Sequence, residues 1–225
     1  MNGYRYENKY IITTAEYLAL RPRLNALMGH DKNVINERGE YFIRSLYFDD
    51  EFQTGLFDKR EGALEREKFR IRFYNFDKSF IRLESKQKHN FLTKKESAPL
   101  THEEVKRILD GDIWDLFDSE HELIRNFYLK SRLRHLRPVV VVDYIREAYT
   151  YNDVRITFDK NIRSANYQTN LFSKGMVTFP CLMANQMILE VKYDEALPYA
   201  VKKLLEPLSA SQTAYSKYEM CRCFQ

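Results

Sequence analysis

The sequence has no hydrophobic run long enough to span a membrane as a helix. Such a helix needs about 18 to 20 predominantly apolar residues in a row, and charged residues interrupt the apolar stretches of this 225-residue chain. The first ten residues, MNGYRYENKY, also lack the apolar segment of a secretory signal. We therefore expect a cytoplasmic protein, which reaches a membrane only through a membrane-protein partner.

Cysteine is scarce, with an odd count made up of Cys181, Cys221 and Cys223. This count argues against a disulfide framework, and the C-x-C pair formed by Cys221 and Cys223 lacks the second pair of a zinc site. The five histidines are scattered without the spacing of metal ligands. We expect the cysteines to be reduced and to take no part in the chemistry.

Glycine is rare, and no repeat, low-complexity tract or linker interrupts the chain. With 44% hydrophobic and 30% charged residues, the composition is that of a globular protein rather than a disordered one. The 16 Tyr and 15 Phe beside only 7 Gly favour strands. We therefore expect one domain over residues 1–225.

Net charge is also small, because 36 Lys and Arg nearly balance 32 Asp and Glu, which leaves +4. Overall charge thus gives no sign of a polyanion partner, and a nucleic-acid partner is not expected. The positions of the basic residues must carry the argument instead.

Alternating residues predict about eight strands, the first near the start of the chain and the others at 41–49, 65–75, 78–88, 139–151, 153–162, 177–181 and 187–193. Residues 50–62 read as a connecting segment. Three capping boxes, beginning at Thr13, Thr101 and Ser119, predict helices, the last one running to about Leu136, and a further helix is expected over 198–208. Hairpins with inserted helices predict an α+β fold around an antiparallel sheet.

Charged residues recur two apart along these strands and therefore share a face. The predicted ionic face carries Lys9, Arg70, Arg72, Arg82, Lys86, Arg146, Arg155 and Lys192 against Glu7, Glu84, Asp159 and Glu190. The opposite face is apolar, as in Phe69, Ile71 and Phe73. One interpretation is a sheet that is dry under helices and charged toward water. The other is a barrel whose charged face lines an inner tunnel.

The types of charge bear on this choice. An ordinary solvated face would contain more Ser, Thr, Gln and Asn. Eight cations in one narrow space would repel one another strongly unless an anion neutralised them. Arginine forks and lysine ammonium groups both suit phosphate oxygens, and the carboxylates suit Mg²⁺ or Mn²⁺ shared with a phosphate. The second interpretation therefore predicts a site for a phosphate chain and a metal.

Seven segments in order also resemble a known family: RYENKY (5–10), KFRIRFY (68–74), LESKQK (83–88), VDYIREAY (142–149), VRITFDKNI (154–162), LEVKYD (189–194) and SKYEMCR (216–222). They are similar to the triphosphate tunnel metalloenzymes, a CYTH-like superfamily. Within it they resemble the polyphosphate polymerase domain of the vacuolar transporter chaperone (VTC) family. The resemblance covers nearly the whole chain and implies an antiparallel eight-stranded β-barrel tunnel with helices packed outside.

The resemblance implies roles for individual residues. The nucleotide triphosphate would be held by Lys9, Arg70, Arg72 and Lys86, and the basic wall would continue through Arg146 and Arg155. Ser216, Lys217 and either Lys94 or Lys95 would contact the phosphate chain, joined by Arg82 and Lys192 from the ionic face. Glu190 would hold the metal, with Glu7 and Glu84 as further ligands.

The activity that the resemblance implies is transfer of the γ-phosphate of ATP to inorganic polyphosphate, pyrophosphate or phosphate, with Mn²⁺ or Mg²⁺. Hydrolases of the superfamily begin with Glu-x-Glu-x-Lys, whereas this chain has Arg5 at the first acidic position, which favours a polymerase. Two alternatives are a triphosphatase and a non-catalytic polyphosphate-binding module. It is also an alternative that Arg146 and Arg155 serve as cross-strand partners of Asp143 or Asp159.

Overall fold

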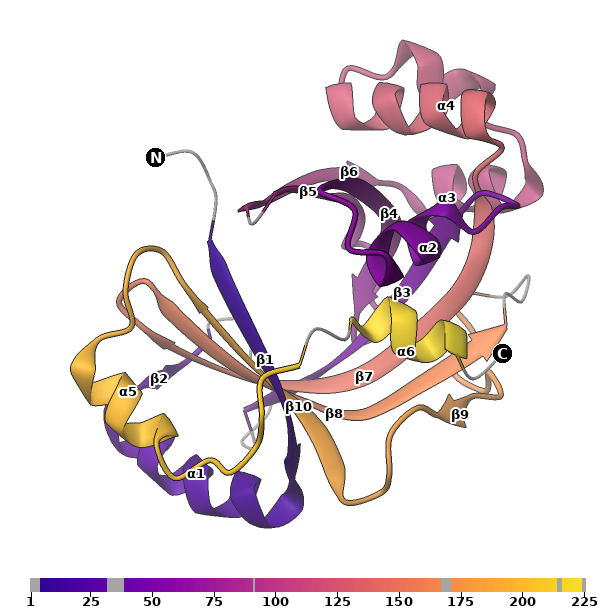
Figure 1. Cartoon of the computed structure of the whole chain (residues 1–225). Helices are drawn as coiled ribbons and strands as arrows, with labels where there is room; N and C mark the ends of the chain where they lie inside the picture. The colour runs from indigo at the N-terminus through magenta and orange to yellow at the C-terminus, as the bar shows by residue number, and fades with distance from the viewer. Residues whose placement is uncertain (1–4, 32–38, 91, 167–170, 214–215, 224–225) are drawn as a thin grey trace.

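One large antiparallel sheet organises the protein (Figure 1). The computed structural model describes residues 5–31, 39–90, 92–166, 171–213 and 216–223. Eight strands follow one another in the order β1-β10-β8-β7-β3-β4-β5-β6, while β2 pairs with β7 and β9 with β8. Their bounds are β1 (Tyr6–Thr13), β2 (Gly29–His30), β3 (Glu40–Asp49), β4 (Glu65–Tyr74), β5 (Ile81–His89), β6 (Leu92–Leu100), β7 (Arg137–Tyr151), β8 (Val154–Asn166), β9 (Phe179–Pro180) and β10 (Gln186–Tyr193).

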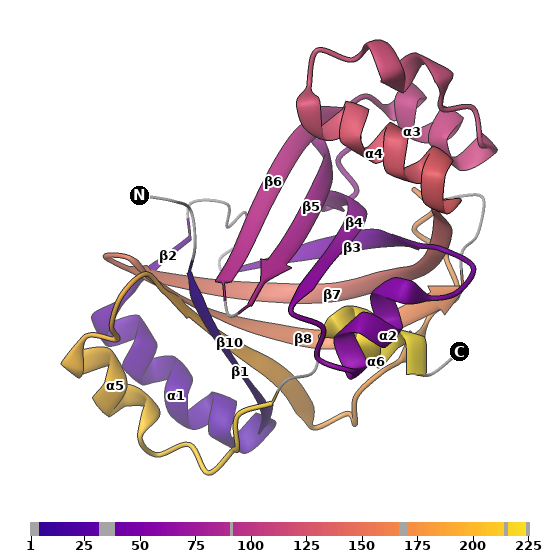
Figure 2. The same cartoon turned by 45° about the horizontal axis from the view of Figure 1, so that its top comes forward.

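The helices cover the sheet in three places, which Figures 1 and 2 show from two directions. Helices α1 and α5 lie against the wing formed by β1, β10 and β8, and α3 and α4 lie against the wing formed by β4, β5 and β6. Helices α2 and α6 lie beside each other at one side, between the wings. The bounds are α1 (Thr14–Leu27), α2 (Thr54–Arg60), α3 (His102–Asp110), the 3₁₀ helix η1 (Trp114–Asp118), α4 (Glu122–Arg134), α5 (Tyr199–Leu205) and α6 (Lys217–Cys223).

The predicted α+β fold with an antiparallel sheet is confirmed, but the sheet is curled rather than closed. Within the described residues no backbone ladder joins the two edge strands, β1 and β6. The long strands β3 and β7 carry register shifts at Tyr47/Phe48 and between Asp143 and Ile145, and such bulges bend strands. Side chains join the wings instead, because Lys86 Nζ of β5 lies 2.9 Å from Glu7 Oε2 of β1. Barrel is therefore a loose description of this sheet.

The apolar faces of both wings pack under the helices, as the alternation predicts. Phe69 of β4 meets Phe127 of α4, with ring centroids 5.4 Å apart. On the other wing Ile156 and Phe158 share a buried cluster with Leu24 of α1. Because alternate residues point the other way, the ionic faces of the two wings are turned toward each other.

The space between the wings also contains a hydrophobic cluster, built around α6. Tyr218 and Cys221 of this helix are buried with Tyr144 of β7 and Tyr47 of β3. The rings of Tyr47 and Tyr218 are 5.2 Å apart. The inner face is thus ionic over part of its length and apolar where α6 packs.

Two of the three predicted capping boxes are confirmed, and the third is wrong. Thr13 and Thr101 each cap a helix, with the reciprocal glutamate bonds in place. Ser119 instead ends η1, and α4 begins after His121 without a side-chain cap. Ser119 and Glu122 have the spacing of the box, but the helix starts two residues later than the box requires. His121 precedes it, so Glu122 is the first residue of α4 and not the third.

Some elements are missing from the sequence prediction. Strand β6 and helices α2 and α6 were not expected, and only Phe179–Pro180 of the predicted strand at 177–181 is extended and paired. Within the described residues, no helix combines the length and apolarity needed to cross a lipid bilayer.

The caps give a matched test of this assignment. Thr101→Ala removes the Oγ1 that accepts the Glu104 N–H at 3.1 Å, and we expect it to lower the free energy of unfolding by about 1 kcal/mol. Ser119→Ala should change that free energy by less than about 0.5 kcal/mol. Urea unfolding of both variants measures the difference, and equal losses would contradict the assignment.

Candidate active site

A cavity of about 930 Å³ lies between the two wings and is strongly basic. Its lining includes eleven Lys or Arg residues and three acidic ones. The basic residues are Arg5, Lys9, Lys68, Arg70, Arg72, Lys86, Lys95, Arg146, Arg155, Lys192 and Lys217, and the acidic ones are Glu7, Asp77 and Glu190. Most of them belong to the ionic face that strand alternation predicts, so this face lines a cavity rather than bulk solvent.

Arg70 and Arg72 project from β4 and are fixed by several groups. Arg70 donates from Nε to Glu84 Oε2 at 2.7 Å and from Nη1 to the Tyr47 hydroxyl at 2.8 Å. Arg72 donates to Ser45 Oγ at 2.9 Å and to the Tyr144 hydroxyl at 3.0 Å. Both guanidinium groups are therefore held in place before any ligand arrives, which favours tight binding of an anion.

Glu84 supports these arginines and does not line the cavity. Its side chain is buried, and Lys95 Nζ lies 2.5 Å from its Oε1 while Arg70 occupies Oε2. Burial alone would raise the pKa of Glu84, but the surrounding cations lower it well below its usual range. Unlike Glu7 and Glu190, Glu84 is not part of the cavity lining, and its predicted role as a metal ligand stays a prediction.

Glu7 and Glu190 form the acidic part of the cavity. Three lysines surround Glu7: Lys9 at 2.8 Å, Lys86 at 2.9 Å and Lys192 at 3.6 Å. Burial and the neighbouring Glu190 would raise the pKa of Glu7, but the lysines lower it to about 2. Both carboxylates are therefore ionised at neutral pH.

These two carboxylates are suitable for a shared rather than an enclosed metal site. Among the described residues, no group of three or more His, Cys, Asp or Glu side chains is arranged to hold a metal ion. Mg²⁺, however, typically binds one or two carboxylates together with substrate phosphates. The pair Glu7 and Glu190 meets that requirement because both line the cavity, whereas Glu84 does not line it.

Arg146 and Lys217 converge on Asp159, a residue that the sequence prediction placed on the ionic face without a role. Arg146 binds both oxygens of Asp159, at 2.6 and 2.8 Å, and Lys217 contacts the same carboxylate. Asp159 is fully buried. The cross-strand alternative is thus correct for Arg146, although its side chain also lines the cavity.

Arg155 has a different partner from the one expected. Its Nη2 lies 2.6 Å from Asp31 Oδ2 and 3.0 Å from the Tyr41 hydroxyl. Asp143 is bound by Arg44 instead, at 2.7 and 2.8 Å. Arg155 is part of the cavity lining, and Asp31, which binds it, is not.

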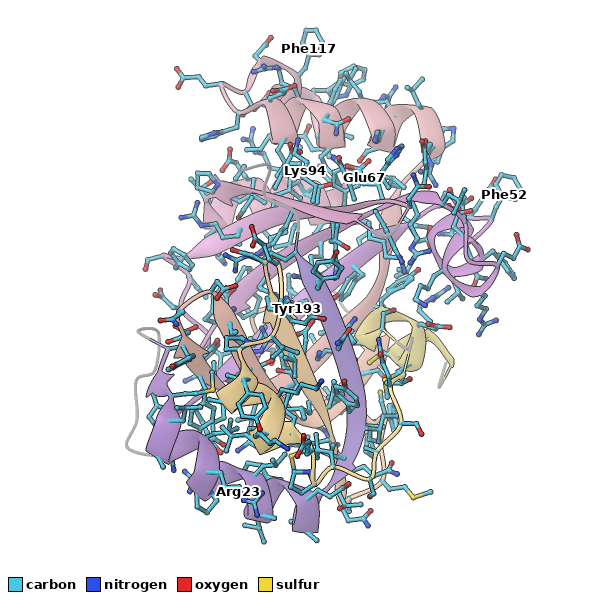
Figure 3. All side chains as sticks on the ribbon, turned by 60° about the vertical axis from the view of Figure 1, so that its left-hand side comes forward. Arg23, Phe52, Glu67, Lys94, Phe117 and Tyr193 are labelled. Atoms are coloured by element: carbon cyan, nitrogen blue, oxygen red, sulfur yellow. The ribbon has the colours of Figure 1, made fainter. Side chains whose placement is uncertain are left out.

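Two predicted substrate contacts lie outside the cavity lining, Arg82 and Lys94. The guanidinium carbon of Arg82 lies 4.6 Å from the centre of the Phe80 ring. Lys94 binds Glu96 at 2.7 Å, and Figure 3 shows it with Glu67 on the side of the wing that faces α4. Alternation separates the two candidate lysines, because Lys95 is paired with the inward Lys86 and Lys94 with Gln87.

The start of α6 brings Ser216 and Lys217 to the cavity. The segment just before it is attached to β1, since the Thr213 N–H donates to the Lys9 carbonyl at 2.8 Å and Gln212 bridges to Tyr10. The closing motif of the sequence therefore reaches the same cavity as the opening one.

Lys68 is a lining residue that the sequence prediction missed. Within the described part of the chain its Nζ is buried without a hydrogen-bond partner, 4.2 Å from the centre of the Tyr218 ring. Burial first, and then Arg66, lowers its pKa to about 7. Alternation from Arg70 and Arg72 was the available signal, because residue 68 shares their face.

Tyr144 is the second residue that was missed. Its ring lies between Arg72, Arg146 and Lys217, whose charged groups are 5.9, 5.3 and 5.1 Å from the ring centre. Burial would raise its pKa, but these cations lower it. Pattern alone did not identify it, because tyrosine in a Val-rich strand is typical of a core.

The lysine pair in β6 tests the cavity directly. Lys95→Ala removes a cation from the lining, and we expect it to weaken binding of inorganic tripolyphosphate about tenfold or more, since a charge-assisted hydrogen bond contributes about 1.5–3 kcal/mol. Lys94→Ala is the matched control and should change the dissociation constant by less than about twofold. Isothermal titration calorimetry at fixed salt measures both, and equal effects would contradict the assigned cavity.

Lys68 makes stability depend on pH. Its folded-state pKa of about 7 lies below the unfolded value of 10.5, so between these values the unfolded state binds more protons and stability rises with pH. We expect Lys68→Met to stabilise the ligand-free protein, by an amount that grows as pH falls from 9 to 7. Urea unfolding at several pH values measures it. Lys106→Met, at an exposed site, is the control, and a pH-independent difference would contradict the buried charge.

Solved structures with the same fold were found by comparison. The chain is similar to a candidate adenylate cyclase from Bacillus halodurans (16% identity over 95% of this chain and 94% of that one, TM-score 0.55). It is also similar to a candidate adenylyl cyclase from Hippeastrum, reported to have a dominant triphosphatase activity (12% identity, 99% and 96% covered, TM-score 0.58). A Pyrococcus horikoshii protein matches with 13% identity, 99% and 100% coverage and a TM-score of 0.52. At these identities the likeness shows the fold alone.

Comparison with curated proteins gives no match. The family comparison is decisive by contrast, because the model of the VTC domain matches residues 4–224. This match covers nearly the whole chain, including the strands that build the cavity and the motif at the start of α6. The chain belongs to the VTC domain family.

Proposed function

We propose that this protein is a polyphosphate polymerase, a single catalytic domain over residues 1–225 that transfers the γ-phosphate of ATP to a phosphate chain. The observation that carries the proposal is the composition of the cavity lining, which contains eleven basic residues and three acidic ones. A linear polyanion neutralises such a lining along its length. The VTC family match and the tunnel-like fold support the same class of ligand.

Phosphoryl transfer requires mainly positioning and stabilisation of charge on the equatorial oxygens. Arg70 and Arg72 are held by Glu84, Tyr47, Ser45 and Tyr144, so they are suitable for fixed contacts to the triphosphate. Lys9 and Lys86 bring ammonium groups from β1 and β5, and both bind Glu7. Arg146, Arg155, Lys192 and Lys217 extend the wall, and Lys95 and Ser216 complete it.

The acceptor in this reaction is already an oxyanion. A terminal phosphate oxygen of the acceptor attacks the γ-phosphorus, the bond from that phosphorus to the β–γ bridging oxygen breaks, and ADP leaves. No proton has to be removed from the acceptor, which agrees with a cavity rich in cations rather than in general bases. Enclosure between the wings also limits attack by water, which favours transfer over hydrolysis.

Glu7 and Glu190 are the residues that would hold Mg²⁺ or Mn²⁺. The metal would neutralise charge on phosphate oxygens when bound. The lysines around Glu7 keep both carboxylates ionised and aimed into the cavity. Replacement of either carboxylate would therefore reduce metal binding and also release a lysine from its partner.

A triphosphatase is the second candidate, because the similar Hippeastrum protein is reported to have that activity. The local feature that favours synthesis is Arg5, which stands where the hydrolases of the resemblance have their first glutamate. Arg5 lines the cavity and binds Asp194 at 2.8 Å. An arginine there adds a positive charge for the phosphate chain where the hydrolases have a carboxylate.

Incubation of the purified protein with ATP and Mn²⁺ tests the proposal. We expect ADP and a long-chain product that is visible on a gel and is digested by an exopolyphosphatase. Release of orthophosphate without long chains would contradict synthesis and support the triphosphatase. Tight, salt-dependent binding of polyphosphate without turnover, unchanged in Glu190→Gln, would support a binding module instead.

Two variants complete the same assay. Arg72→Ala should lower product formation about 100-fold or more, the effect expected when one preorganised donor to the transition state is lost. Arg23→Ala, on the exposed face of α1 (Figure 3), should leave the rate unchanged. Equal rates for the two variants would show that the cavity is not the site of reaction.

A further inference from the structure

One end of the cavity differs in chemistry from the rest. Where β4 turns into β5, the lining consists of Tyr74, Asn75, Asp77 and Phe80, and Tyr41 of β3 lies across from them. The ring of Tyr74 is 6.0 Å from that of Tyr41 and 5.9 Å from that of Phe80. We call these five residues the hairpin mouth. Phosphate groups bind cations and hydrogen-bond donors, which aromatic rings do not supply. This part of the cavity is therefore suitable for another part of a ligand.

The side chain of Phe80 is accessible to a ligand in the cavity. It lines the cavity and is nevertheless 45% exposed, whereas most large hydrophobic side chains of these strands are buried under helices. The guanidinium of Arg82 lies over the Phe80 ring at 4.6 Å, which fixes the ring and adds a planar cation beside it. Aromatic rings with a neighbouring arginine form stacking sites for nucleobases.

Asp77 adds a hydrogen-bond acceptor to the hairpin mouth. Its Oδ1 accepts from the backbone N–H and the hydroxyl of Ser79, at 2.8 and 2.6 Å, and these bonds lower its pKa. Glu7 and Glu190, the other acidic lining residues, are matched by lysines. A carboxylate repels phosphate but accepts hydrogen bonds from hydroxyl and amino groups. Ribose hydroxyls and the amino group of a base supply such donors.

The hairpin mouth is rigid. Asn75 and Phe76 both have positive φ, 50° and 59°, and the Asp77 N–H donates to the Tyr74 carbonyl at 2.8 Å, which makes a two-residue turn. A phenylalanine in this region of φ is strained. Its ring is held by stacking on Phe42, with centroids 4.5 Å apart. The packing therefore fixes the turn and, with it, the lining side chains.

We propose that the hairpin mouth is a nucleoside subsite, in which the base stacks on Phe80 and Tyr74 while Asp77 accepts from the sugar or the base. This inference rests on the proposed function, which places the phosphates deeper in the cavity. It implies that the protein discriminates a nucleoside triphosphate from inorganic tripolyphosphate. It also orients the nucleotide, because the γ-phosphate then points away from the hairpin mouth, toward Lys68 and the start of α6.

Two ligands and two variants test this subsite. Binding of ATP and of inorganic tripolyphosphate, both with Mg²⁺ at fixed salt, is measured for the wild type, Phe80→Ala and Phe52→Ala. Phe52 is a matched control, since it is 75% exposed and absent from the cavity lining (Figure 3). We expect Phe80→Ala to weaken ATP binding about 5- to 150-fold, the range for loss of one base stack, and to leave tripolyphosphate binding within about twofold. Phe52→Ala should change neither.

Other results would overturn the subsite. Unchanged ATP binding in Phe80→Ala contradicts stacking, and an equal loss for both ligands shows that the residue supports the cavity and not a nucleoside. Phe80→Tyr, which keeps the ring, should restore ATP binding and guards against a folding defect. If the wild type binds neither ligand, the proposed function fails together with the subsite, whereas tight tripolyphosphate binding without any preference for ATP removes the subsite alone.

Discussion

Repulsion among the cations of the cavity is the constraint on which the rest of the structure depends. Lysine and arginine side chains from both wings point into one space, and like charges at short range destabilise the folded state. Carboxylates counter this repulsion at three places. The buried Glu84 and Asp159 lie beside Arg70 and Arg146, and the half-buried Glu7 lies among three lysines. The compensation is incomplete, because the buried Nζ of Lys68 has no hydrogen-bond partner among the residues that the structure describes. The remaining positive charge is what an anionic ligand neutralises.

The architecture serves this concentration of charge. A strand separates apolar from ionic residues without loss of either, so each wing buries one face under helices and turns the other inward. Because β3 and β7 bend through their register shifts, the two ionic faces meet instead of pointing into solvent. Tyrosines also position the arginine side chains. Their hydroxyls hold Arg70, Arg72 and Arg155 in place without adding charge.

Much of this could be predicted from alternation, and the failures have identifiable causes. Parity placed Arg70, Arg72 and Glu190 on one face, and it separates Lys95 from Lys94 once the register of β6 is known. That strand was missed because LTKKESAPL is polar, ends near a proline and lies at the sheet edge. The third capping box failed because a Ser-x-x-Glu pattern does not fix where the helix starts. Pairings such as Arg155 with Asp31 join residues 124 apart, and local pattern carries no information on them.

The attachment of residues 212–213 to β1 has a consequence for folding. Gln212 and Thr213, which come shortly before the helix that carries Lys217, pair with the first strand. The cavity therefore requires contacts between regions that are about 200 residues apart in the sequence. Such contacts close large loops and form slowly. The phosphate-binding interior therefore depends on residues from both ends of the chain, and a nascent chain would complete its set of cavity cations only after Lys217 has been synthesised.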